Sequence, residues 1–283
     1  MKRSIHSVTR RQFMSAAGTA AAATAVGFSV PSMAAENHAK SVPFQLGLAS
    51  YTTRKFSLEQ TIEMAVRLNL KNLCLKSFHL PMDATPAECA AAAKKCKDAG
   101  LNLYGGGVIT MKTEADVNQA FDYAKAAGMS VIVGVPYPEV LPLVDSKVKE
   151  YNIKVAIHNH GPGDKVYPTP ESAIERVKDL DPRIGLCVDI GHTVRIGADP
   201  IEDITRFADR LHDLHIKDVS APTKEGETLE IGRGVIDMPA FLRALVKSGY
   251  SGIASFEYEK DADDPLPGLA ESVGYVRGVL AAI

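Results

Sequence analysis

The sequence has no tryptophan, only four cysteines among its 283 residues, and almost no excess charge of either sign. A formal net charge of −2 provides no basic surface of the kind that binds nucleic acid, so nucleic acid is not expected as a partner. Beyond the N-terminal segment, no apolar run is long enough to cross a bilayer. With 46% hydrophobic and 23% charged residues, the composition is that of a globular protein with a buried core.

The four cysteines do not predict a disulfide. Cys89 and Cys96 lie on one expected helix, where seven residues separate them by about 10 Å at ~1.5 Å per residue, too far to bridge. Cys74 and Cys187 end two different apolar runs, and we expect both to be buried as small hydrophobic side chains.

The first 35 residues resemble a twin-arginine export signal rather than part of the fold. Arg10 and Arg11 precede an Ala-rich apolar stretch, and the small residues that follow Pro31 suit cleavage. A retained membrane anchor is the alternative, but the stretch is short and rich in Ala and Gly, which makes it a poor membrane span. The segment therefore predicts cleavage, no stable membrane insertion and a periplasmic or other extracytoplasmic location.

The rest of the chain, residues 36–283, alternates short apolar runs with amphipathic stretches that end at glycines. This alternation favours parallel strands joined by crossover helices, and about eight such units match the size of a (β/α)8 TIM barrel, an α/β fold. An open doubly wound sheet is the alternative, but no Gly-rich phosphate motif follows the first run. The apolar runs lie at 44–50, 72–78, 101–108, 130–136, 154–159, 184–190, 211–216 and 252–257.

Metal-type ligands end the last four apolar runs. Because the C-terminal ends of barrel strands meet at one mouth, these side chains are expected to converge, and burial of several ionisable groups without a partner would be costly. Imidazole and carboxylate together suit a divalent cation, with manganese preferred and cobalt or zinc possible. The expected ligands are His158, Asp189, His215 and Glu257.

Other polar residues follow the expected strands and are weaker candidates. His160 shares a strand face with His158, and His192 lies three residues after Asp189 across a glycine that permits a sharp turn. Glu259 and His212 are expected to be solvated or to support the ligands, and Asp218 to orient a histidine or cap the next segment. Candidate substrate-binding residues are Lys76, His79, His192, Lys217 and Arg233.

With these residues identified, the chain resembles the xylose isomerase-like TIM-barrel superfamily, which includes sugar phosphate isomerases and epimerases, inosose dehydratase and endonuclease IV. The most specific segments are VDIGHT (188–193), LHIKD (214–218), IGRGVID (231–237) and FEYE (256–259). The resemblance implies metal ligation by the four residues above and substrate contacts from His192 and Arg233. It departs at the fifth strand, where the 3-epimerases carry Glu and this chain has His158, so which of His158 and His160 binds metal stays open.

The resemblance predicts metal-dependent removal of a proton next to a sugar carbonyl. The cation would stabilise an enediolate as a Lewis acid, while Glu257, His158 or His160 acts as the base and neighbouring polar groups orient hydroxyls. Isomerisation or epimerisation is the leading outcome. Elimination from a 3-keto-glycoside is the rival, because only one Glu of the epimerase pair is clear and export removes the enzyme from sugar phosphates.

Two further readings are weaker. An endonuclease IV-like site needs additional histidines and a positive surface, and a non-catalytic sugar-binding barrel would not need the four ligands. The expected partner is a small sugar or keto-glycoside, and the barrel could form a homodimer.

Overall fold

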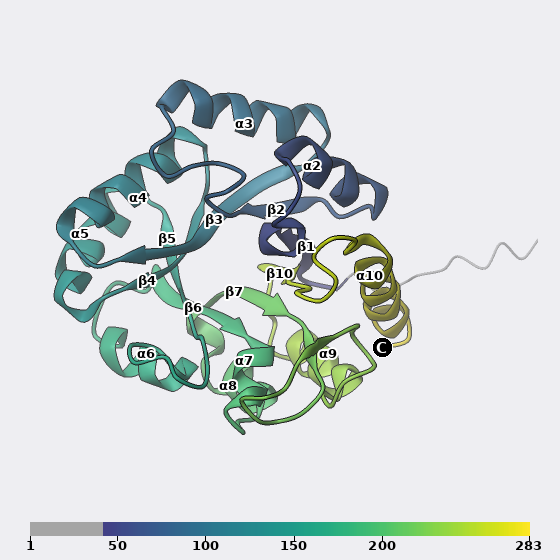
Figure 1. Cartoon of the computed structure of the whole chain (residues 1–283). Coiled ribbons are helices and arrows are strands. Elements are labelled where there is room, and N and C mark those ends of the chain that lie inside the picture. The colour runs from purple at the N-terminus through teal and green to yellow at the C-terminus, as the bar shows by residue number, and fades with distance from the viewer. Residues whose placement is uncertain (1–41) are drawn as a thin grey trace, which may run out of the picture. The chain divides into compact units, whose positions relative to one another are not determined.

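The computed structural model describes residues 42–283, so the expected signal peptide at residues 1–35 lies outside the described residues, as does the predicted start of the domain at 36. Within the described range, eight parallel strands close into a barrel in the order β1-β10-β7-β6-β5-β4-β3-β2. Figure 1 shows the helices arranged around these strands. The structure is the predicted (β/α)8 TIM barrel, and closure between β1 and β10 excludes the open sheet. The barrel strands are β1 (Gln45–Ala49), β2 (Asn72–Leu75), β3 (Asn102–Met111), β4 (Val131–Pro136), β5 (Lys154–His158), β6 (Ile184–Asp189), β7 (Leu211–Ile216) and β10 (Ile253–Phe256).

The helices begin and end at residues that the sequence marks clearly. Ser57, Thr85 and Thr113 each cap a helix in a reciprocal capping box, which satisfies backbone N–H groups of the first turn. Gly100 and Gly128 adopt φ of +75° and +67° just beyond two of the helix ends, a conformation that favours glycine. The α-helices are α2 (Leu58–Arg67), α3 (Pro86–Asp98), α4 (Glu114–Ala126), α5 (Leu141–Tyr151), α6 (Pro170–Val177), α7 (Ile190–Arg195), α8 (Pro200–Arg206), α9 (Met238–Lys247) and α10 (Leu266–Ala281), and the 3-10 helices are η1 (Ser50–Thr53), η2 (Pro138–Val140) and η3 (Ala208–Arg210).

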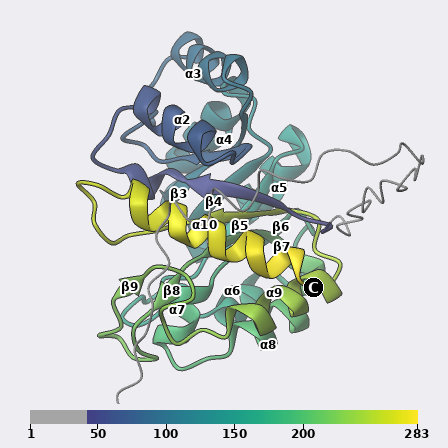
Figure 2. The ribbon, with the colours of Figure 1, turned by 90° about the vertical axis from the view of Figure 1, so that its right-hand side faces the viewer.

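A short antiparallel hairpin interrupts the regular alternation after β7. Its strands are β8 (Asp218–Val219) and β9 (Thr228–Leu229). Figure 2 shows the hairpin beside α7, at the end of the barrel toward which the strands run. The sequence did not predict this element, because each of its strands has only two residues.

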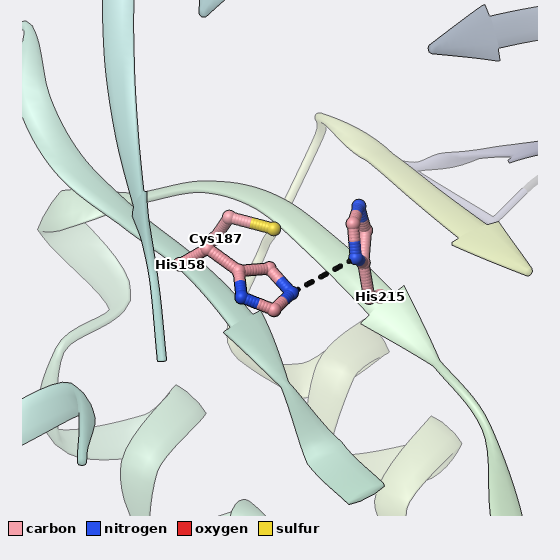
Figure 3. A group of neighbouring side chains, drawn as sticks. All are labelled: His158, Cys187 and His215. Carbon is pink, nitrogen blue, oxygen red and sulfur yellow. Dashed lines mark hydrogen bonds between the residues drawn. The ribbon is translucent and has the colours of Figure 1, made fainter. Parts of the chain in front are cut away.

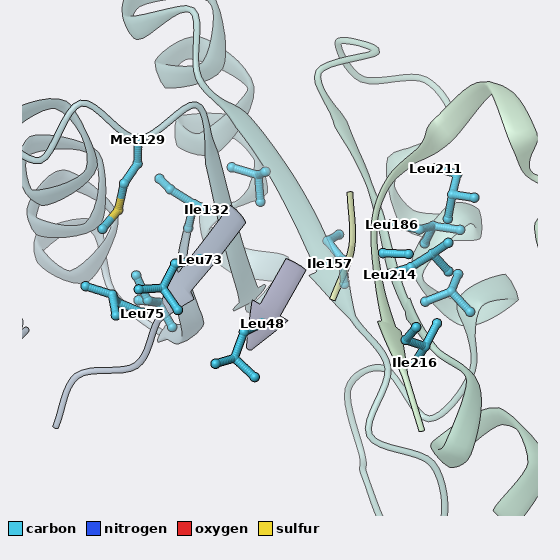
Figure 4. Packing of buried hydrophobic residues seen from close by; sticks show 14 of the residues in the cluster. Leu48, Leu73, Leu75, Met129, Ile132, Ile157, Leu186, Leu211, Leu214 and Ile216 are labelled. Carbon is cyan, nitrogen blue, oxygen red and sulfur yellow. The ribbon is translucent and has the colours of Figure 1, made fainter. Parts of the chain in front are cut away.

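The core divides into a layer between sheet and helices and a smaller interior layer. Strand residues such as Leu48, Leu73 and Ile157 pack outward against the helices (Figure 4). Alternate residues on the same strands point inward. The interior cluster contains Cys74, Tyr104, Val131, Val133, Ala156 and Cys187. Along β7, this alternation places Leu214 and Ile216 outward and leaves Asp213 and His215 facing the barrel interior.

All four cysteines are free and buried, and Cys89 and Cys96 lie on the same helix, α3, as predicted. Among the described residues, none of the helices combines the length and apolar character that crossing a bilayer requires.

Candidate metal centre and pocket

Four neighbouring strands position the predicted ligands at one point at the mouth of the barrel. His158 ends β5, Asp189 ends β6, His215 lies in β7, and Glu257 directly follows β10. The strand register aligns Asp189 with His215, and the Glu257 N–H donates to the Ile216 carbonyl at 3.1 Å. Inward-facing residues at the C-terminal ends of adjacent parallel strands lie at one mouth, which brings the four side chains together.

The ligand atoms are spaced as they would be around a single cation. His158 Nε2 lies 3.1 Å from His215 Nδ1 and 3.4 Å from Asp189 Oδ2, and His215 Nδ1 lies 3.2 Å from Glu257 Oε2. One atom from each of the four residues lies within 4.8 Å of the others. Ligands at about 2.0–2.2 Å in a tetrahedral site are about 3.4 Å apart, so the observed spacing and the donor set fit a divalent cation.

The same cluster contains two buried imidazole nitrogens that make no hydrogen bond, His158 Nδ1 and His215 Nε2. A buried polar atom that stays unpaired costs about 1–3 kcal/mol. On the side of the centre, Asp189 Oδ2 faces the His158 imidazole at 3.4 Å and the Lys217 ammonium at 2.8 Å. Asp189 uses its other oxygen, Oδ1, to accept from the His192 N–H at 2.9 Å at the start of α7, which leaves Oδ2 for the centre.

The electrostatics of His158 and Asp189 favour the protonation states that metal binding requires, whereas at His215 burial lowers the pKa but Glu257 outweighs burial and raises it. Burial lowers the pKa of His158 to about 3, so its imidazole is neutral. Burial alone would raise the pKa of Asp189, but Lys217 and the neighbouring imidazoles His192 and His158 hold it well below its usual range. Neutral imidazole and ionised carboxylate are the forms that donate lone pairs to a cation.

Lys217 lies inside this cluster with a fully buried side chain. Its ammonium is 2.8 Å from Asp189 Oδ2 and 2.7 Å from Glu257 Oε2, and it also forms an ion pair with Glu259. Burial lowers the pKa of Lys217, but these three carboxylates outweigh burial and raise it well above its ordinary value. Gly191 makes room for the lysine, because a Cβ there would lie 2.5 Å from Lys217 Cγ. The sequence predicted a substrate contact at Lys217; the ion pairs with the predicted ligands were not foreseen.

A cavity of about 240 Å³ opens onto the cluster. It brings together three more predicted residues, Lys76, His160 and His192, with Tyr51, whose ring lies 5.3 Å from the Lys76 ammonium. Burial lowers the pKa of both His160 and His192, which keeps their imidazoles neutral at neutral pH and able to accept a proton. The remaining lining residues are Val108, His158, Glu257 and Glu259.

Besides the buried Lys217, two predicted substrate-binding residues do not line this cavity. The His79 ring is buried, with Nδ1 2.9 Å from Ser50 Oγ and Nε2 3.1 Å from the Phe56 carbonyl, so both nitrogens are used by the protein. Arg233 is exposed and forms a two-point ion pair with Glu271, with N–O distances of 2.5 and 2.8 Å. The sequence placed His79 after the second strand and Arg233 in a Gly-flanked loop, but it could not show that other groups already bind them.

Two supporting residues were missed or only partly foreseen. Asn159 braces the end of β6, because its side chain accepts from the Asp189 N–H at 2.9 Å and donates to the Asp189 carbonyl at 3.3 Å. Asp218 caps the segment after the hairpin, as one of its two predicted roles, by accepting from the N–H groups of Gly232, Gly234 and Ile236. The position of Asn159 between the candidate ligands His158 and His160 could have indicated this supporting role from the sequence.

The sequence profile described as xylose isomerase-like TIM barrel matches residues 16–279. An inosose dehydratase of Lacticaseibacillus casei is 30% identical over 138 residues, 43% of this chain and 45% of that protein, so the match spans less than half of its length.

Two solved structures share the fold at low sequence identity. The IOLI protein, described with a binding zinc atom, superposes with a TM-score of 0.69 at 18% identity, over 84% of this chain and 99% of that one. An L-ribulose 3-epimerase superposes with the same TM-score of 0.69 at 17% identity, over 84% and 95%. These likenesses establish the architecture, whereas the chemistry has to come from the residues of this chain.

Proposed function

The chain belongs to the xylose isomerase-like TIM barrel family, and we propose that it is a divalent-metal-dependent enzyme that removes a proton next to the carbonyl of a sugar or a related cyclic ketone. The observation that carries this proposal is the convergence of two imidazoles and two carboxylates beside a cavity that also holds two further imidazoles, His160 and His192. Relatives named as a dehydratase and an epimerase support the same initial step, since both names are consistent with chemistry at a carbon beside a carbonyl.

The four clustered residues would hold the cation. When bound, the cation supplies Lewis acidity, which stabilises negative charge that develops on a substrate carbonyl oxygen. Manganese is our first choice, with cobalt or zinc as alternatives, because carboxylates suit manganese while imidazoles accept all three.

His160 is the residue that we assign as the general base. His158 and Glu257 face the other ligand atoms at 3.1–3.4 Å in the cluster, whereas His160 lines the cavity outside the four-residue set. Its lowered pKa keeps a lone pair available at neutral pH. His192 and Lys76 line the same cavity and would orient substrate hydroxyls, and His192 could donate a proton to a departing oxygen.

A specific observation favours elimination as a second outcome besides epimerisation. Both carboxylates that line the cavity, Glu257 and Glu259, follow the same strand, β10, while the imidazoles His158, His160 and His192 come from the β5 and β6 segments. Epimerisation by two carboxylates on opposite faces of a sugar therefore has no support here. An imidazole opposite a carboxylate suits expulsion of a hydroxyl or glycosidic oxygen, because it can protonate the leaving group.

The substrate proposal rests on the N-terminal segment. Export by the twin-arginine route would place the enzyme outside the cytoplasm, where free sugars and oxidised glycosides occur and sugar phosphates do not. We therefore propose a ketose or a 3-keto-glycoside as substrate.

The test is to incubate the manganese-loaded protein with a 3-keto-glucoside in D2O. Aglycone release would indicate elimination, and deuterium uptake next to the carbonyl without release would indicate isomerisation or epimerisation. His160→Asn should reduce either rate by about 10²–10⁴-fold. Arg233→Met, which changes an exposed residue outside the cavity, is the matched control. Neither release nor deuterium uptake with metal-loaded protein and a panel of ketoses would refute the proposed function.

A further inference from the structure

The interior of the barrel directly beneath the metal centre is polar. Interiors of TIM barrels are normally filled by bulky branched side chains. Here Tyr104, Cys187, Asp213 and Ser255, which we call the polar floor, occupy this level. The Tyr104 hydroxyl donates to Asp213 Oδ1 at 3.0 Å and lies 2.8 Å from Ser255 Oγ, and the Cys187 thiol donates to Asp213 Oδ2 at 3.7 Å. Each of these four side chains is buried.

Cys187 connects the polar floor to the metal centre. It lies two residues before Asp189 on β6 and therefore points to the same inward face, one level deeper. In the strand register, Cys187 is paired with His158 on one side and Asp213 on the other. A ligand atom from each of His158, Cys187 and His215 lies within 4.8 Å of the other two. Figure 3 shows the Cys187 sulfur pointing toward the space between the two imidazole rings.

Two imidazole nitrogens remain without partners even when the centre above is accounted for. The short distances at the centre involve His158 Nε2 and His215 Nδ1. The other nitrogen of each ring, His158 Nδ1 and His215 Nε2, is buried and makes no hydrogen bond. His215 Nε2 lies 3.9 Å from Asp213 Oδ2, too far for a hydrogen bond. Each of the two imidazoles therefore has one nitrogen at the upper centre and one that makes no hydrogen bond.

We propose that His158, Cys187 and His215 form a second, deeper cation position, with Asp213 at its edge, which takes a thiophilic divalent cation such as zinc or cadmium. Thiolate ligands select zinc and softer metals, whereas the carboxylates of the upper position suit manganese. The two positions share the imidazoles of His158 and His215. A thiophilic cation in the deeper position thus withdraws these ligands from the upper one and competes with manganese.

Binding at Cys187 requires the loss of a proton. As the sulfur–metal bond forms, the S–H bond breaks and its proton passes to Asp213 Oδ2, the oxygen that already accepts from Sγ at 3.7 Å. The proton then stays on the Asp213 carboxyl group, and the sulfur exchanges its bond to hydrogen for a bond to the metal.

Cobalt(II) provides the direct test, because a cobalt–thiolate bond gives an intense charge-transfer band in the near ultraviolet that nitrogen and oxygen ligands do not give. Full-length protein titrated with cobalt should develop this band. Cys187→Ser should lose it, and Cys74→Ser, which removes another buried thiol of the barrel interior, should keep it. Absence of the band at saturating cobalt in the wild type, or its persistence in Cys187→Ser, would overturn the proposal.

X-ray absorption of the zinc-loaded wild type keeps the test decisive if the variants do not fold. A sulfur neighbour at about 2.3 Å supports the deeper position, while nitrogen and oxygen neighbours alone at about 2.0–2.2 Å overturn it. Neither readout depends on turnover, so a failure of the proposed reaction would leave this result intact. Asp189→Asn, which alters only the upper position, should retain the sulfur signal.

Discussion

The ammonium of Lys217 lies 2.8 Å from Asp189 Oδ2, an oxygen that also faces the His158 imidazole at 3.4 Å. A protein cation and a candidate metal position therefore share one carboxylate oxygen. The buried negative charges of this centre are compensated partly by the chain itself, which explains how Asp189 and Glu257 can both be ionised inside the barrel.

Removing one predicted ligand should remove the metal. Wild-type protein is expected to bind about one manganese per chain at the upper position, and Asp189→Ala and Glu257→Ala should each weaken binding by more than about 100-fold, since loss of a ligand exceeds the usual effect of a supporting residue. Plasma mass spectrometry after dialysis measures this directly. Variants that keep a full complement of manganese would show that the ligand set is wrong.

Replacing Lys217 by methionine should destabilise the metal-free protein by about 3–5 kcal/mol, because buried carboxylates lose their counter-ion. Manganese should restore part of this loss, since a cation at the centre again compensates the charge. Urea unfolding with and without manganese gives both values. The matched control is Lys55→Met, which breaks an exposed ion pair with Asp263 and should leave the unfolding midpoint unchanged. Equal effects of the two substitutions would contradict the assignment.

Gly191→Ala should disturb the same lysine without touching a charge. A methyl group there would lie 2.5 Å from Lys217 Cγ, so the lysine stem or α7 must shift. We expect a loss of about 1–3 kcal/mol in unfolding free energy, as for other overpacked sites. Gly274→Ala is the control, because a Cβ at that glycine meets no atom within 4 Å. An unchanged stability for Gly191→Ala would mean that this packing is loose.

His212, which lies away from the metal centre, should make stability depend on pH. Burial, reinforced by Lys154, lowers its pKa to about 4 in the folded protein, while the unfolded chain retains a pKa near 6.5. Because the unfolded state takes up the proton first, stability is lost as pH falls from 6.5 to about 4, by up to about 3 kcal/mol, and is constant with respect to this group above 6.5. His212→Gln should flatten that part of the stability curve in metal-free protein. An unchanged slope would show that His212 does not contribute.

The barrel and the convergence of the four candidate ligands were predictable from the sequence for the same reason. Strand side chains alternate in direction and parallel strands end at one mouth, so the positions of His158, Asp189, His215 and Glu257 followed from their places in four apolar runs. A local sequence pattern cannot show which other group of the protein already forms a hydrogen bond or an ion pair with a side chain. Lys217, His79 and Arg233 are all polar residues close to strand ends, yet one is held by three carboxylates, one by Ser50 and Phe56, and one by Glu271. These partners come from distant parts of the chain.

One carboxylate, Asp218, fixes the path of the backbone from 232 to 236, because it accepts N–H groups from three residues of that segment. Gly234 cannot change, since a Cβ would lie 2.1 Å from Asp218 Oδ1. The side chains of Arg233 and Val235, in contrast, are exposed and take no part in the hydrogen bonds to Asp218. In this segment the backbone conformation is therefore fixed, whereas the side chains at positions 233 and 235 can vary. A library randomised at 233 and 235 should retain the fold in nearly all its members, which makes this loop the natural place to engineer new surface properties into the barrel.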